Sequence, residues 1–157
     1  MMNFENVTTS YIDAETYPWI PFAPYSAEVF VKMLKADPIS GTFVTLLKAP
    51  GNIVLPKHHH CGTVIVYTVK GRWKYREHDW TAAPGSVVYE TAASTHTPEG
   101  ACEGEVVTLN IQVGDSIYLD ADGGVLAIEN WKTMLQRYLD YAKAQGIVPI
   151  DVTSFAG

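Results

Sequence analysis

Between about Val29 and Leu119 the sequence is a succession of short β-branched and aromatic runs, broken by Gly, Pro, Asn and Asp. Residues of the first kind favour strands, and those of the second kind favour the turns between them. The run VFVKMLKAD also fits a helix, but DPISG follows it as a hairpin turn that leads into TFVTLL. We therefore expect strands throughout, arranged as a sandwich or a small barrel. The expected strands are VFVKMLKA, TFVTLLKA, TVIVYTV, RWKYRE, SVVYE, EVVTLNIQV and SIYLD, with ADGG as the turn after the last one.

Helical periodicity is convincing in a single segment near the C-terminus. From Trp131 onwards apolar residues recur three or four positions apart, Asn130 occupies the N-cap position, and Gly146 follows the last turn. We expect a helix over about 130–145 that packs one face on the sheets. The apolar residues of that face are Met134, Leu135, Tyr138, Leu139 and Ala142.

The domain organisation follows from the chain length and from the segment that precedes the strands. With 157 residues, 47% of them hydrophobic, the chain can bury one core and needs no second domain. We expect a single domain over 1–157, with an extended arm over about 1–28 and a barrel over about 29–128. The arm contains the proline-rich, aromatic segment YPWIPFAPY. Such an arm can lie across its own domain or across a partner subunit, and we favour the partner.

The distribution of charge narrows the choice of partners. The net charge of -6 arises without any acidic run, and Lys and Arg are scattered along the chain. We therefore expect a small-molecule partner, with no nucleic acid and no membrane surface. The N-terminus has no basic and apolar leader, and no stretch approaches the roughly 18 apolar residues of a membrane span. These features predict a cytoplasmic protein.

The cysteines and several aromatic residues are expected to have structural roles and no role in binding metals or nucleic acids. Cys61 and Cys102 are not spaced as a metal-binding pair, so we expect free thiols, with Cys61 as a small buried side chain. No basic groove accompanies the aromatic residues, which argues against a platform for stacking nucleic-acid bases. The aromatic residues expected in the core and the cavity wall are Tyr67, Trp73, Tyr75 and Tyr89.

Three consecutive histidines stand in LPKHHHCG, inside an apolar stretch and far from either end of the chain. Successive side chains of a strand point to opposite faces, so His58 and His60 share a face and His59 points away. Two imidazoles leave a divalent metal under-coordinated, so a site needs a third ligand from another strand. His96, 36 residues after His60, is the candidate, whereas His78 lies among charged residues and is expected to be exposed.

The glycines and histidines of this region resemble the two sequence boxes of the cupins. The residues that match the first box, G-x5-H-x-H-x3,4-E-x6-G, are Gly51, His58, His60 and Gly71, with one extra residue before the first histidine. Val64 and Ile65 stand where its glutamate would be, which excludes the usual site of three histidines and this glutamate. The second box, G-x5-P-x-G-x2-H-x3-N, retains Gly85 and His96, with Thr91, Ala93 and Gly100 at its other positions.

The chain from about Tyr17 to Leu135 is also similar to two families of three-histidine cupins. These are the acetylacetone (diketone-cleaving) dioxygenases and the 2,4'-dihydroxyacetophenone dioxygenases. YPWIPFAP resembles their opening arm, YLDADGGVLAIENW resembles the closing hairpin and helix start of the first family, and GRWKYREHDW and YETAASTHT resemble the second. The resemblance implies an all-β cupin, a double-stranded β-helix or jelly-roll barrel with one C-terminal α-helix, assembled as a homodimer or homotetramer.

The same resemblance implies one non-haem Fe(II) bound by His58, His60 and His96, and a reaction of O2 with a small β-diketone or α-hydroxyketone that breaks a carbon–carbon bond. The residues alone do not determine the identity of the metal, because neutral imidazoles bind Fe, Zn, Cu and Ni alike. Zn, Ni or Mn are therefore alternatives in a purified sample. Two other functions remain open: an O2-independent isomerase or hydrolase, and a non-catalytic cupin that senses a metal or ligand.

Glu90 and Arg76 are further site candidates. Glu90 lies six residues before His96, at the spacing where the diketone-cleaving family carries an acidic residue beside its metal. A carboxylate there would orient a ligand histidine, hydrogen-bond the substrate or take its proton, so Glu90 is the candidate catalytic and substrate-binding residue. The resemblance places Arg76 near the pocket, as a second substrate-binding candidate that pairs with Glu90 or steers an anion.

Overall fold

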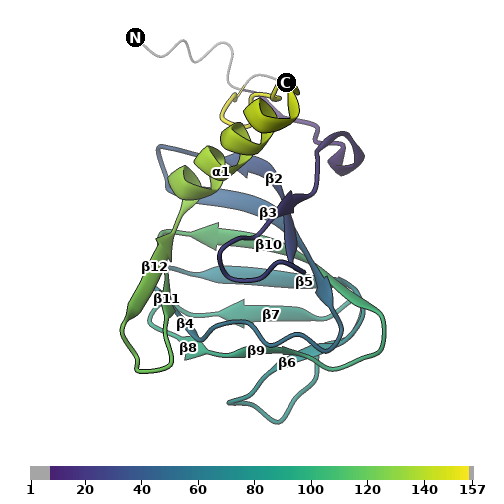
Figure 1. Ribbon diagram of the computed structural model, residues 1–157, viewed down its shortest axis with the longest axis vertical. Helices are drawn as coiled ribbons and strands as arrows, with labels where there is room; N and C mark the ends of the chain where they lie inside the picture. Colours follow the sequence, from purple (N-terminus) through teal and green to yellow (C-terminus); the bar gives the residue numbers. More distant parts are fainter. Residues whose placement is uncertain (1–7, 156–157) are drawn as a thin grey trace.

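The computed structural model describes residues 8–155 and consists mainly of antiparallel strands. A six-stranded sheet has the order β1-β2-β3-β10-β5-β7, a four-stranded sheet has the order β12-β11-β4-β8, and β6 pairs with β9. Figure 1 shows β2, β3, β10, β5 and β7 stacked below one another, β12, β11, β4 and β8 beside them, and α1 across one end. The bounds are β1 Ile20–Pro21, β2 Phe30–Ala36, β3 Thr42–Pro50, β4 His58–His60, β5 Val64–Lys70, β6 Trp73–Tyr75, β7 Val87–Glu90, β8 Thr95–His96, β9 Pro98–Gly100, β10 Glu105–Val113, β11 Ser116–Leu119, β12 Val125–Glu129 and α1 Trp131–Gln145.

The expected strands are confirmed, including the ambiguous run before DPISG, which forms β2. In the turn that follows, the Asp37 carboxylate accepts hydrogen bonds from the backbone N–H groups of Ile39 and Ser40. This local pairing closes the hairpin, and β2 and β3 run antiparallel from it. The all-β barrel with one C-terminal helix is therefore the observed fold.

The helix also begins and ends as its caps predict. Asn130 accepts hydrogen bonds from the N–H groups of the first turn, and Gly146 adopts the left-handed conformation, with φ of 65°, just past the end. Met134, Tyr138 and Ala142 form the buried stripe. The expected apolar face is too wide, since Leu139 is 38% exposed. One residue is about 100° around a helix, so Leu139 lies on the flank of the face that Tyr138 buries.

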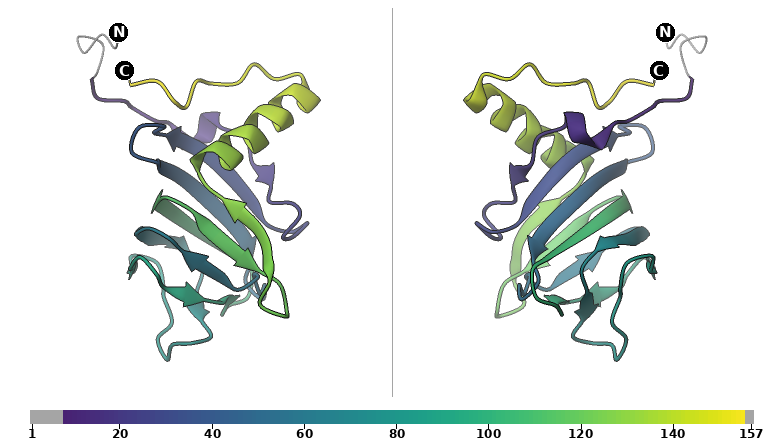
Figure 2. Two further views of the ribbon diagram at one scale, coloured as in Figure 1. Left: turned by 90° about the vertical axis from the view of Figure 1, so that its left-hand side faces the viewer. Right: turned by 90° about the vertical axis from the view of Figure 1, so that its right-hand side faces the viewer.

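The arm packs on its own chain, so the preference for a partner subunit is wrong for its described part. β1 pairs with β2, with Ile20 opposite Val31, and Ile20 and Phe22 are buried in the core. α1 contacts both β1 and β2 at this end of the barrel (Figure 2). The apolar side chains of the arm thus complete a core that the sheets leave open. Residues 1–7 of the expected arm lie outside the described residues.

Two assignments made from composition are wrong. Cys61 is exposed, because it lies in the turn that follows β4 and not on an inward strand position. Tyr67 and Tyr89 are exposed, whereas Trp73 and Tyr75 are buried as expected. The alternation of side chains along a strand explains the exposure of Tyr67, because its two neighbours on β5 are the residues that point inwards. Both cysteines are free thiols, as predicted.

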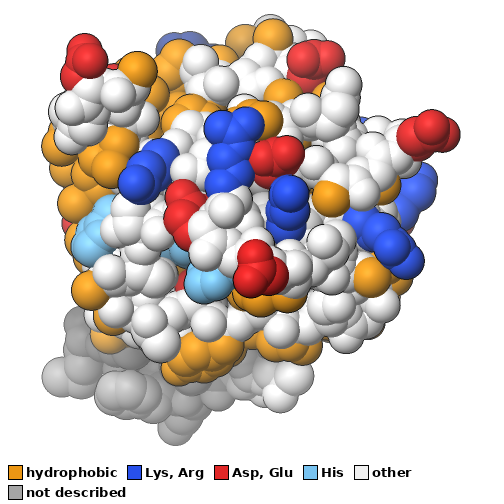
Figure 3. All heavy atoms as spheres, turned by 90° about the horizontal axis from the view of Figure 1, so that it is seen from below, with side chains coloured by type: hydrophobic (Ala, Val, Ile, Leu, Met, Phe, Trp, Pro, Cys, Tyr) orange, Lys and Arg blue, Asp and Glu red, His pale blue; other side chains and the backbone are white. Residues whose placement is uncertain are grey.

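The surface carries charges of both signs. The end of the molecule opposite α1 shows Lys and Arg side chains interspersed with Asp and Glu (Figure 3). Among residues 8–155 no helix is long and apolar enough to cross a membrane.

Candidate metal centre

Two neighbouring strands deliver three histidines to one point. His58 and His60 are on β4, and His96 lies directly opposite His58 on β8. All three are buried, with at most 6% of their surface exposed. His59 lies between them on β4 but faces outwards, with its Nδ1 2.8 Å from the hydroxyl of Thr95. The predicted alternation of β4 is therefore confirmed.

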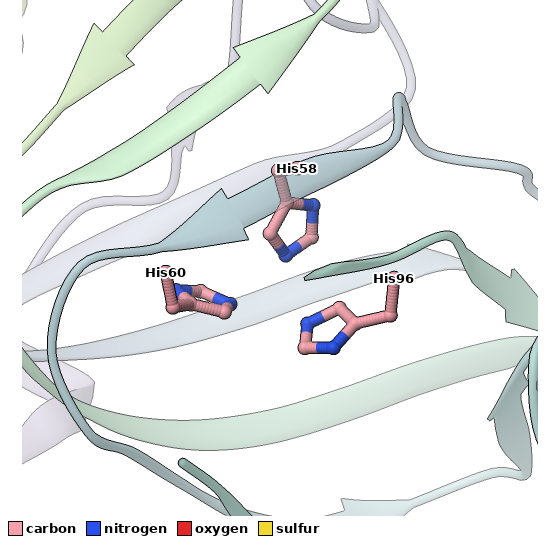
Figure 4. A group of neighbouring side chains, drawn as sticks. All are labelled: His58, His60 and His96. Atoms are coloured by element: carbon pink, nitrogen blue, oxygen red, sulfur yellow. The ribbon is translucent and has the colours of Figure 1, made fainter. Parts of the chain in front are cut away.

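The three imidazoles point toward one another inside the barrel (Figure 4). One nitrogen from each lies within 4.8 Å of the others, a spacing compatible with a single metal ion. Nδ1 of His58 lies 3.1 Å from the backbone oxygen of Pro56, which can only accept, so this nitrogen carries the proton and leaves Nε2 as a free electron-pair donor. Nδ1 of His60 is held by the hydroxyl of Ser116 at 3.0 Å. Such outer contacts orient ligand histidines.

Three buried atoms at this point have no hydrogen-bond partner among the described residues. They are Nε2 of His60, Nε2 of His96 and Oε2 of Glu90. The carboxylate oxygen is 2.8 Å from the first nitrogen and 3.4 Å from the second, yet neither contact is aligned as a hydrogen bond. Buried polar atoms are nearly always satisfied, and an ion among these atoms would satisfy all of them. The residues present therefore fit a divalent metal.

Burial and charge set the protonation states that a metal needs. Burial, together with a smaller electrostatic effect of the nearby His60 and His96, lowers the pKa of His58 to about 3. His58 is therefore neutral at pH 7. Burial on its own raises the pKa of Glu90, but the contacts with His60 and His96 outweigh it and lower this pKa to about 2. Glu90 is therefore ionised.

Aromatic side chains wall the site: Tyr75 is among those expected in the core and the cavity wall, whereas Tyr118 is not singled out from the sequence. Tyr75 donates a hydrogen bond to Oε1 of Glu90, and its ring stacks on His96 with centroids 3.7 Å apart. Tyr118, on β11, stacks on His58 with centroids 5.0 Å apart. Trp73 and Tyr75 are buried on either side of the half-buried Lys74 in a short strand, and this alternation is the one sequence signal for their inward position.

Arg76 lies outside this group. Its side chain is 54% exposed, and its Nε donates to Oε2 of Glu99 at 2.7 Å. The expected pairing of Arg76 with Glu90 is wrong, because Tyr75 is the inward residue of β6 and occupies that position. His78 is on the surface and stacks on Trp80, in agreement with its expected exposure.

A cavity extends from the histidines through the barrel towards α1. Most of its walls are apolar, while Thr45, Thr108 and Asn110 form a polar stripe on β3 and β10. Glu129 also lines it, and Arg137 of α1 holds this buried carboxylate at 2.6 Å. The site is thus a group of side chains that could hold a metal, opening into a largely apolar chamber, a setting suited to a small ligand.

The comparisons with known proteins agree with this fold. The model of the ChrR cupin-like domain family matches residues 7–115. The structure of an RmlC-like cupin protein from Ralstonia eutropha JMP134 is 54% identical, with a TM-score of 0.94 over 98% of this chain and 99% of that one. An acetylacetone dioxygenase from Acinetobacter johnsonii is 18% identical, with a TM-score of 0.78 over 89% of this chain and 97% of that one. No curated protein sequence matches.

The last likeness shows the fold alone, because the sequence identity is low. The family model and the Ralstonia structure each cover most of the chain. The match spans β4 and β8, which carry the three histidines. This chain therefore belongs to the cupins, in the family of the ChrR cupin-like domain.

Proposed function

We propose that the chain is a non-haem Fe(II) dioxygenase that cleaves a carbon–carbon bond of a small β-diketone or α-hydroxyketone. The observation that carries the proposal is a buried group of three histidines, with an ionised carboxylate beside it, at the end of a largely apolar cavity. The structural likeness to acetylacetone dioxygenase supports the same reaction class.

The chemistry of the cavity suits an enolisable ketone. When bound, the metal would polarise the carbonyl oxygens of such a substrate and bring the substrate and O2 together. The histidines add no charge of their own, so the site stays positive and favours an anionic enolate. Val64, Val66 and Val106 line the chamber and exclude water, which strengthens electrostatic attraction inside it.

Glu90 is the group that we propose to take the substrate's proton. Its Oε1 is held by Tyr75, while Oε2 faces the imidazoles and has no hydrogen-bond donor among the described residues. An ionised carboxylate in this position can accept the proton from the carbon between two carbonyl groups. Arg76, at the surface beside the cavity residue Glu99, would act at the entrance by attracting an anionic substrate.

Oxygen uptake tests this function. The protein is purified without oxygen, loaded with Fe(II), and mixed in an oxygen electrode with a panel of β-diketones and hydroxyacetophenones. We expect at least one ketone to give O2 consumption in proportion to its loss, and we expect His96→Ala to give none.

Three other outcomes would contradict the proposal. The absence of O2 uptake by fully iron-loaded protein over the whole panel would exclude it. Substrate loss without O2 would indicate an isomerase or hydrolase that uses Zn, Mn or Ni. Ligand-dependent thermal stabilisation without turnover would indicate a sensing cupin.

A homodimer or homotetramer remains our expectation for the assembly.

A further inference from the structure

The pairing of β5 with β7 brings a carboxylate to the place where the first cupin box lacks one. Val64 occupies one of the two positions where that glutamate would stand, and Glu90 lies directly opposite Val64 in the register of the two strands. Directly opposed residues of an antiparallel pair have Cβ atoms about 4.5–5.5 Å apart and share a face of the sheet. Both side chains are buried, so the Glu90 carboxylate enters the barrel beside the vacant position.

The contacts of this carboxylate fit a cation placed between it and the histidines. Oε2 of Glu90 lies 2.8 Å from Nε2 of His60 and 3.4 Å from Nε2 of His96. A nitrogen that gives its electron pair to a metal carries no proton, so it cannot donate a hydrogen bond to the carboxylate. A bare carboxylate oxygen this close to two such nitrogens is repelled unless the same positive ion attracts all three atoms.

The two distances are also those expected between ligands of one ion. Ligand atoms about 2.1 Å from a metal and at right angles to each other lie about 3 Å apart. The separations of 2.8 Å and 3.4 Å fall on either side of that value. We propose that Glu90 is a fourth protein ligand of the metal, so that this cupin has three histidines and one carboxylate, with the carboxylate supplied by β7 and not by β5.

Tyr75 completes this arrangement. Its hydroxyl donates to Oε1, which leaves Oε2 as the oxygen available to the metal. The two roles of Glu90 then follow one another. The carboxylate would hold the metal when no substrate is bound, and with a ketone in the cavity the same carboxylate would lie next to the substrate proton and accept it.

The proposal rests on the metal centre and not on the dioxygenase reaction, so its test needs neither O2 nor a ketone. The full chain is stripped of metal, loaded with Zn2+ and crystallised, and the distance from the metal to Oε2 of Glu90 is measured. We expect about 2.0–2.2 Å, the usual length of a bond between zinc and a carboxylate oxygen. A distance above 3 Å, with the ion held by the histidines, would overturn the proposal.

Zn2+ affinity provides the second readout. Glu90→Gln keeps the size of the side chain but replaces the anionic ligand, and Glu105→Gln removes a carboxylate that pairs with Lys70 on the surface. Loss of a group that only supports a ligand weakens metal binding 10- to 100-fold, so we expect Glu90→Gln to raise the Kd by more than about 100-fold. We expect Glu105→Gln to leave it unchanged. Equal Kd values for the two variants would contradict the proposal, whatever the catalytic activity proves to be.

Discussion

Replacing His96 by alanine is expected to abolish tight metal binding, whereas the same change at His59 is expected to leave it nearly intact. His96 supplies one of the three converging nitrogens, and without it the two remaining imidazoles come from a single strand. His59 lies on that strand too, but it faces outwards and contacts Thr95. Both variants lose one imidazole. A difference in metal affinity between them therefore reflects where the lost histidine lies and not the number of histidines that remain.

Isothermal titration of the metal-stripped variants with Zn2+ measures this difference. We expect a Kd for His59→Ala close to that of the unaltered chain and no saturable high-affinity site for His96→Ala. Circular dichroism spectra that match the unaltered protein would show that both variants are folded. Equal losses of affinity would show that alternation along β4 does not decide which histidines bind the metal.

Gly71→Ala is expected to lower the free energy of unfolding by about 3 kcal/mol, from backbone strain and overpacking together. Gly71 has a positive φ of 78°, and an added Cβ would lie 2.3 Å from the backbone oxygen of Glu105. The obstacle is the backbone of β10, a central strand, so it cannot move aside as a flexible side chain could. Urea unfolding followed by circular dichroism measures the change.

Gly85 provides the matched control. Its φ of 89° is also positive, but no heavy atom lies within 4 Å of the position of an added Cβ. Gly85→Ala should therefore lose only the cost of the backbone conformation, about 1 kcal/mol. If the two variants lowered the free energy of unfolding equally, the close approach between Gly71 and β10 would contribute nothing to the effect of Gly71→Ala.

Local chemistry made much of the fold predictable. The turn at DPISG decided between strand and helix for β2, and the caps Asn130 and Gly146 located α1. The alternation of side chains along β4 separated His58 and His60 from His59. Each of these features depends on residues close together in the chain, which is where sequence patterns are most informative.

The rest of the site depends on contacts between distant segments. Glu90 reaches the histidines through the register of β5 against β7, and Tyr75 replaces Arg76 as its neighbour because β6 folds back beside β9. No local pattern encodes either pairing. The arm illustrates the same difficulty, since its aromatic composition suits a partner surface as well as the core of its own chain.

We propose that the buried histidines form a mononuclear metal centre. The most direct test of this proposal is the metal content of the chain after the metal-free protein is saturated with Fe(II) or Zn2+ and freed of excess. We expect one tightly held ion per chain, which is lost when His58, His60 and His96 are all replaced by alanine. No retained ion, or an ion retained equally by the triple variant, would contradict it.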